Sequence, residues 1–194
     1  MTSARKRVGI LVWDGVELLD FAGPGEVFAV AEGHFEVVTV GLSLDPILSQ
    51  GFLTVRPEFE IADCPALDVL VIPGGDTDNT RVNHGVLEFV RSRADEVQVI
   101  LSVCTGALVL AAAGLLDGRS VTTWHGAAER LQALVPSAQL RLDQRWVDEG
   151  NIVTTAGVTA GIDGALHVVA RLCGEALAQR VARYIEYTPG QVTS

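Results

Sequence analysis

The chain has 194 residues, which fits one domain, and 48% of them are apolar, enough for a sizeable core and too many for a disordered chain. Its 24 acidic and 14 basic residues leave a net charge of −10. Because such a chain repels phosphate backbones, we expect no nucleic-acid binding by this chain alone.

We also expect a cytoplasmic protein that does not enter a membrane. The sequence has no run of about 18 apolar residues, so no membrane span is predicted. The apolar run after the basic residues 4–7 stops at Asp14 and is too short for a signal peptide. The three cysteines, Cys64, Cys104 and Cys173, are far apart and form no metal-binding pair or disulfide framework.

The apolar pattern predicts one domain over residues 1–194, in which strands alternate with helices. The expected strands cover 8–13, 35–40, two short edge strands within 52–61 on either side of Pro57, 68–72, 97–103, 121–124, and a hairpin of 146–147 with 152–153. The expected helices have Pro24 in a first turn continued over 26–31, and then cover 82–94, 106–113, 162–172 and 176–185.

This alternation predicts an α/β fold with a doubly wound, mostly parallel sheet and helices on both faces. In such folds ligands bind beyond the carboxyl ends of the strands. Residues that directly follow a strand are therefore the candidates for function.

Cys104 is the strongest of these candidates. A strand ends at it and an alanine-rich helix follows at once, with Gly106 letting the turn close tightly. A side chain on such a turn is held out at the sheet edge, as in nucleophile elbows. The helix N-terminus favours the thiolate, so we expect a partly exposed cysteine of low pKa.

Two further strand ends offer partners for a thiolate. Gly74 and Gly75 follow the strand 68–72, and their backbone N–H groups, with that of Thr105, are expected to form an anion-stabilising pocket. His125 follows the strand 121–124 and is a candidate base, with a structural role as the alternative.

An acid near the cysteine is expected after the first strand. Glu17 and Asp20 precede the Gly23-Pro24 helix start, and either carboxyl is able to hold a proton beside the sulfur. The residues alone do not separate these two acids.

Several segments, in this order, resemble the ThiJ/PfpI superfamily, which has the class I glutamine-amidotransferase-like fold, and most resemble its isocyanide hydratase branch. The segments that carry the resemblance are 19–24, 62–68, 72–75, 102–106, 112–118, 122–123 and 159–163. Together they cover nearly the whole chain.

The resemblance implies a homodimer that acts on a small molecule with no metal or organic cofactor. By position, Cys104 matches the nucleophile, Asp20 the acid, Thr105 the residue after the nucleophile and Gly23 a backbone contact near the acid. The implied reaction converts an isocyanide to an N-substituted formamide.

One position departs from the family pattern. Relatives read Thr-Thr-His-Trp or Thr-Thr-His-His, whereas here Trp124 stands at the first histidine position and His125 follows it. We count Trp124 and His125 among the candidate substrate-binding residues, and leave open which of them replaces the family histidine.

Two other functions remain as alternatives. The same domain precedes a helix-turn-helix module in AraC-type regulators. A chain ending at Ser194 leaves no room for that module, so a ligand-binding domain without catalysis is the first alternative. The second is a glyoxalase- or deglycase-like activity on α-oxoaldehydes, as elsewhere in the superfamily.

Overall fold

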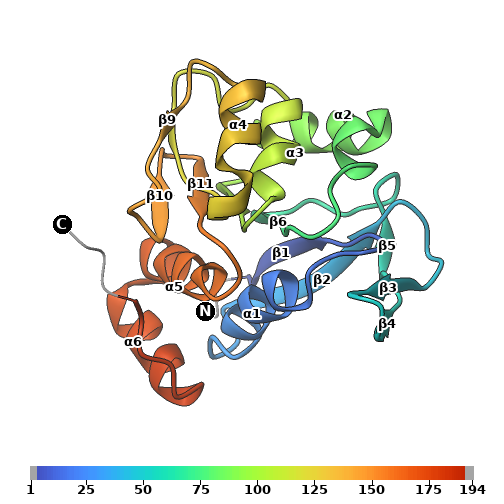
Figure 1. Ribbon diagram of the computed structural model, residues 1–194. Coiled ribbons are helices and arrows are strands. Elements are labelled where there is room, and N and C mark those ends of the chain that lie inside the picture. The colour runs from blue at the N-terminus through green and yellow to red at the C-terminus, as the bar shows by residue number, and fades with distance from the viewer. Residues whose placement is uncertain (1–3, 191–194) are drawn as a thin grey trace.

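A computed structural model describes residues 4–190. Its central sheet has seven strands in the order β10-β11-β7-β6-β1-β2-β5 (Figure 1). The pairing of β10 with β11 is antiparallel, and every other pairing is parallel. The strands are β1 (Lys6–Leu11), β2 (Phe35–Gly41), β5 (Phe59–Glu60), β6 (Val69–Ile72), β7 (Val99–Ser102), β10 (Trp146–Asp148) and β11 (Ile152–Thr155).

Helices cover both faces of this sheet. On one face lie α1 (Leu18–Ala29) and α5 (Ala160–Cys173), and on the other α2 (His84–Ala94) and α3 (Gly106–Ala112). The helix α4 (Ala128–Leu134) packs on α3, and α6 (Glu175–Tyr184) packs on α5. The predicted doubly wound α/β fold is confirmed.

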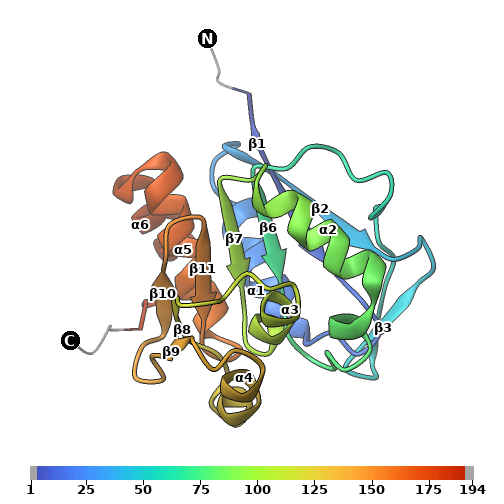
Figure 2. The ribbon, with the colours of Figure 1, turned by 90° about the horizontal axis from the view of Figure 1, so that it is seen from above.

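The central strands are apolar throughout because both faces of the sheet are covered. All four residues of β6, β7 and β11 are buried. Seen from above, α2 and α3 lie over the sheet, while β10 and β11 lie at the opposite edge from β2 (Figure 2). The parallel strands β1, β6 and β7 therefore bring the residues that follow them to one edge.

Two predictions of local structure are wrong in position. The helix α1 begins at Leu18, so Pro24 is its seventh residue instead of lying in a first turn. Pro24 is buried in this helix, which packs against α5, and the proline removes one backbone N–H from it.

The predicted strand 121–124 is also shorter than expected. The strand β8 ends at Val121 and pairs with β9 (Gln139–Leu140) outside the central sheet. His125 instead begins a short 3₁₀ helix, His125–Ala127. A second 3₁₀ helix, Thr80–Val82, precedes α2.

The region 52–61 does contain two short strands, but they belong to different sheets. The strand β5 forms an edge of the central sheet, as predicted. The strand β4 (Leu53–Val55) pairs with β3 (Ile47–Ser49) as a separate ribbon.

Candidate active site

Cys104 lies on the sharp turn between β7 and α3 that the sequence predicts. Its φ of +57° is in the left-handed region, which is strained for a side chain other than glycine. Three contacts hold this conformation. The Cys104 N–H donates to the Ala156 carbonyl at 3.1 Å, the Cys104 carbonyl accepts from the Thr123 hydroxyl at 2.7 Å, and Gly106 packs against the Ile72 carbonyl, where a Cβ would come within 2.1 Å.

Asp20 is the carboxyl that faces this cysteine. It lies in the first turn of α1 and is fully buried. Its Oδ2 accepts a hydrogen bond of 2.9 Å from the Gly74 N–H, and the carboxyl also faces the Cys104 thiol and the Val158 N–H. Its Oδ1 is buried and makes no regular hydrogen bond within residues 4–190. An oxygen without a donor favours protonation, which places an acidic proton beside the sulfur.

Burial dominates the electrostatics of this pair. Desolvation raises the pKa of Asp20 to about 7, and the nearby charge of Glu17 adds to the rise, while the Gly74 N–H opposes it. Desolvation and the Asp20 charge raise the pKa of Cys104 to about 12, and the Thr105 and Val158 N–H groups oppose that rise.

The prediction of a partly exposed, low-pKa cysteine is therefore wrong, because Cys104 is buried and the pKa of its thiol is raised. Cys104 as a residue is only 7% exposed, and helix α3 begins two residues beyond it. Because the two groups share one buried site, they titrate as a pair. The first proton leaves the pair near neutral pH. Backbone N–H groups stabilise the anion that remains, those of Gly74 and Val158 at Asp20 and those of Thr105 and Val158 at Cys104.

Gly74 and Gly75 serve the site in a different way from that predicted. Their N–H groups are occupied, since Gly74 donates to Asp20 and Gly75 donates to the Thr105 Oγ1 at 2.9 Å. The Thr105 hydroxyl donates back to the Gly75 carbonyl at 3.1 Å. A Cβ at Gly74 would lie 2.7 Å from the Thr105 nitrogen and 2.8 Å from Asp20 Oδ2. These glycines therefore orient the acid and Thr105, and do not form an open anion pocket.

A cavity of about 400 Å³ opens onto Cys104. Five of the residues singled out by sequence meet there, and they are Glu17, Gly75, Cys104, Thr105 and Trp124. Its full lining is Gly15, Glu17, Gly75, Asp76, Cys104, Thr105, Trp124 and Val158.

Trp124 forms one wall of this cavity. Its indole packs between two glycines, since a Cβ at Gly126 would lie 2.4 Å from the ring and one at Gly157 2.7 Å from it. Trp124 as a residue is 39% exposed. The position that departs from the family pattern therefore shapes the entrance to the cysteine.

Four predicted site residues do not line the cavity. Asp20 and Gly74 are buried and hydrogen-bonded to each other, and the other two are His125 and Gly23. His125 is exposed, and its ring lies 5.2 Å from that of Trp124, centre to centre. Gly23 is buried in α1 against α5, where a Cβ would lie 3.0 Å from the Ile162 side chain. Because β8 ends at Val121, His125 lies outside the cavity. Gly23 allows the close packing of α1 against α5.

Val158 is the site residue that sequence reasoning misses. It has a φ of +53° just before α5, and its N–H faces both Asp20 and Cys104. A β-branched residue rarely adopts this conformation, so no local pattern predicts it.

The described residues contain no cluster of three or more His, Cys, Asp or Glu side chains able to hold a metal ion. No helix among them is both long and apolar enough to span a membrane.

The fold agrees with comparisons to known proteins. Residues 6–171 match the model of the DJ-1/PfpI family. The chain belongs to this family. It is 38% identical over 184 residues to an isonitrile hydratase of Pseudomonas putida, covering 94% of this chain and 79% of that protein.

Two other similar proteins bear on function and fold. The HTH-type transcriptional regulator GbdR of Pseudomonas aeruginosa is 26% identical over 93% of this chain, which spans 50% of the regulator. A crystal structure of a ThiJ/PfpI family protein from Pseudomonas syringae superposes with a TM-score of 0.88 at 33% identity, over 98% of this chain and 78% of that one.

Proposed function

We propose that this protein is a cysteine-dependent hydratase that converts a small isocyanide to an N-substituted formamide. The buried Asp20–Cys104 pair is the observation that carries the proposal. It places a nucleophile that lines the cavity beside a buried acid whose pKa lies near neutrality, as general acid catalysis requires. The similarity to an isonitrile hydratase supports the choice of substrate.

In the proposed mechanism the Cys104 sulfur attacks the terminal carbon of the isocyanide and forms a C–S bond. Asp20 donates its proton to that carbon, which gives a thioimidate. Water then adds to the same carbon, with Asp20 taking one of its protons as the nitrogen gains another. Loss of the cysteine sulfur releases the formamide, so that the net change is the addition of one water.

Supporting groups have defined parts in this scheme. The N–H groups of Thr105 and Val158 stabilise the sulfur anion. Gly74 fixes the carboxyl. Trp124 limits the size of the substituent on the isocyanide nitrogen.

We further propose that the chain forms one domain, acts in the cytoplasm and works as a homodimer. The exposed apolar side chains near the β3–β4 ribbon support the dimer, and they are Leu42, Leu44, Leu48, Phe52 and Leu53. The Leu48 carbonyl accepts a hydrogen bond of 2.9 Å from Gly15, a residue of the cavity wall. A second subunit on this ribbon would exclude water from the open side of the cavity.

A turnover screen tests the function. The purified protein is incubated with aliphatic and aromatic isocyanides and, separately, with methylglyoxal, and the products are measured by mass spectrometry. We expect formamide from at least one isocyanide, no formamide with Cys104→Ser, and a loss of about 10²- to 10⁴-fold with Asp20→Asn. Cys173→Ser, a change outside the cavity, should retain parental turnover.

The regulator-like relative gives the second candidate, a ligand-binding domain without catalysis. Isocyanide binding without product in the parent protein would favour it. Consumption of methylglyoxal alone would favour the glyoxalase-like alternative. Either result would refute the hydratase proposal.

A further inference from the structure

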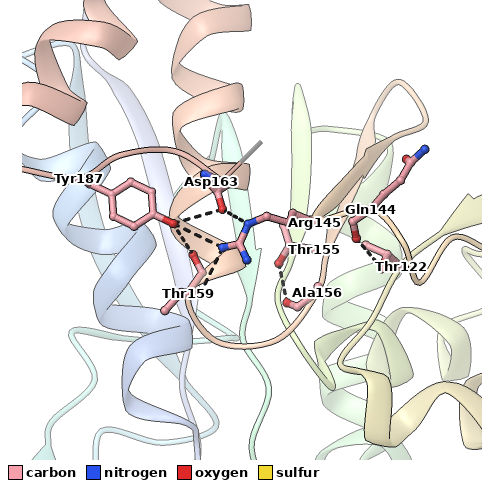
Figure 3. A network of polar contacts seen from close by, with 9 residues as sticks. Thr122, Gln144, Arg145, Thr155, Ala156, Thr159, Asp163 and Tyr187 are labelled. Carbon is pink, nitrogen blue, oxygen red and sulfur yellow. Dashed lines mark hydrogen bonds and ion pairs between the residues drawn. The ribbon is translucent and has the colours of Figure 1, made fainter. Parts of the chain in front are cut away.

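An ionic network centred on the buried Asp163 contacts the turn that follows Val158. The Asp163 side chain is 2% exposed, and its Oδ2 accepts from Arg145 Nε at 2.6 Å and from the Tyr187 hydroxyl at 3.2 Å. Its Oδ1 accepts from the Gly190 N–H at 2.9 Å. Figure 3 shows Arg145, Asp163 and Tyr187 converging from three segments of the chain. The network thus joins α5 to the bend before β10 and to the segment after α6.

The same groups bind the turn that precedes α5. Arg145 Nη2 donates to Thr159 Oγ1 at 3.2 Å, and the Tyr187 hydroxyl lies 3.4 Å from the Thr159 carbonyl. The Thr159 hydroxyl makes no capping hydrogen bond to α5. Its polar atoms therefore face the network, one residue after Val158.

The Val158 turn needs such support. Its φ of +53° is unfavourable for a β-branched residue, so the turn would relax to an ordinary conformation unless its neighbours held it. A relaxed turn would carry the Val158 N–H away from the Cys104 sulfur and the Asp20 carboxyl that it now faces.

We propose that Arg145, Asp163 and Tyr187 are positioning residues that lock the Val158–Thr159 turn and thereby keep the Val158 N–H on the Asp20–Cys104 pair. They do not touch the cavity. They act through Thr159, and the proposal rests on Cys104 as the proposed nucleophile but not on the identity of the substrate.

This role predicts a change in the ionisation of the pair. The other titratable groups at the cavity are Glu17, at the start of α1, and Asp76, after β6, and no Lys, Arg or His of the described chain lines it. The anion left by the first ionisation is therefore stabilised by backbone N–H groups alone. Loss of the Val158 N–H should move that ionisation to higher pH.

Alkylation of Cys104 by iodoacetamide measures this ionisation without any turnover. The rate is followed by peptide mass spectrometry from pH 5 to pH 9.5, which separates Cys104 from the other two cysteines. Tyr187→Phe removes the hydroxyl from the network, and Tyr184→Phe, at a 72% exposed position, is its matched control. Thr159→Ala removes the Arg145 contact, while Thr159→Ser retains it.

We expect Tyr187→Phe and Thr159→Ala to move the midpoint of the alkylation curve upward. Alkylation at pH 6 should slow by about threefold to tenfold, with the plateau rate at high pH retained. Tyr184→Phe and Thr159→Ser should follow the parent curve. If Tyr187→Phe does not fold, the two Thr159 variants decide the question.

An unmoved midpoint in the folded variants would overturn the proposal, even if their thermal stability fell, because a purely structural network would give that result. An equal shift in Tyr184→Phe or Thr159→Ser would overturn it as well. A shifted midpoint in a protein that turns over no isocyanide would refute the proposed function and leave this inference standing.

Discussion

Replacing the buried acid Asp20 by asparagine should make the protein more stable at alkaline pH while it loses activity. Asp20 is fully buried, and its carboxyl has one regular hydrogen bond, from Gly74. Asparagine keeps the shape and an oxygen that accepts from Gly74, but it carries no charge. The variant therefore avoids the cost of placing a carboxylate in this site.

The size of the effect follows from the pKa of Asp20. Burial raises this pKa from 3.8 to about 7, so the folded state holds the proton more tightly than the unfolded state. Such a group contributes stability below pH 3.8, and the contribution is lost as the pH rises through 7. At about 1.36 kcal/mol for each pKa unit, the total loss is about 4 kcal/mol, of which about 2.6 kcal/mol falls between pH 5 and pH 8.

The measurement is urea unfolding of the parent and of Asp20→Asn at pH 5 and pH 8. The other titrating groups are common to both proteins and cancel in the difference between them. We expect the variant to gain about 2 to 3 kcal/mol relative to the parent between the two pH values, or about 4 to 12 °C in melting temperature. Asp76→Asn, the same change at an exposed carboxyl of the cavity, should give almost no such gain.

The same difference between variant and parent at both pH values would refute this reasoning. It would mean that Asp20 ionises in the folded protein as it does in the unfolded chain. A gain for Asp76→Asn equal to that of Asp20→Asn would also refute it, because burial would then not be the cause. Stability gained at the expense of activity is typical of a functional site.

Three further predictions concern assembly, specificity and the glycine turn. Light scattering at micromolar concentration should give a dimer of the 20.6 kDa chain. Phe52→Asp should weaken this dimer by placing a charge on the apolar ribbon. A parent protein that is a monomer would contradict the proposed assembly. Because Trp124→Ala opens one wall of the cavity, it should lower KM for bulky aromatic isocyanides by about tenfold and leave KM for small aliphatic isocyanides little changed. Equal effects on both classes would contradict a role of Trp124 in size selection. Gly74→Ala should lower the free energy of unfolding in urea by about 1 to 3 kcal/mol, because its Cβ would meet backbone and the Asp20 carboxyl. Gly85→Ala, at a helical position with contacts of 3.4 Å, should lower it by almost nothing. Equal losses in the two variants would contradict the close approach at Gly74.

The sequence alone determined the fold class and the sharp turn that carries the proposed nucleophile. Runs of apolar residues long enough for strands, such as β6 and β7, are typical of a sheet covered on both faces. Cys104 stands between such a strand and an alanine-rich helix, and this local pattern fixes the sharp turn. The hairpin of β10 and β11 was likewise predictable, because Gly150 adopts the positive φ that its turn requires.

Only the tertiary structure decided how the groups around Cys104 act. Glu17 and Asp20 are equivalent as residues, and the early start of α1 buries Asp20 against Gly74 while Glu17 stays at the cavity wall. The ionisation of Cys104 depends on desolvation by elements distant in sequence, which opposes the expectation from its own helix. Val158 reaches its strained conformation beside a network formed by residues 14 to 42 positions apart in the chain. Local patterns specify which backbone forms, but burial and long-range contacts set the protonation and orientation of the side chains, because these depend on everything packed around them.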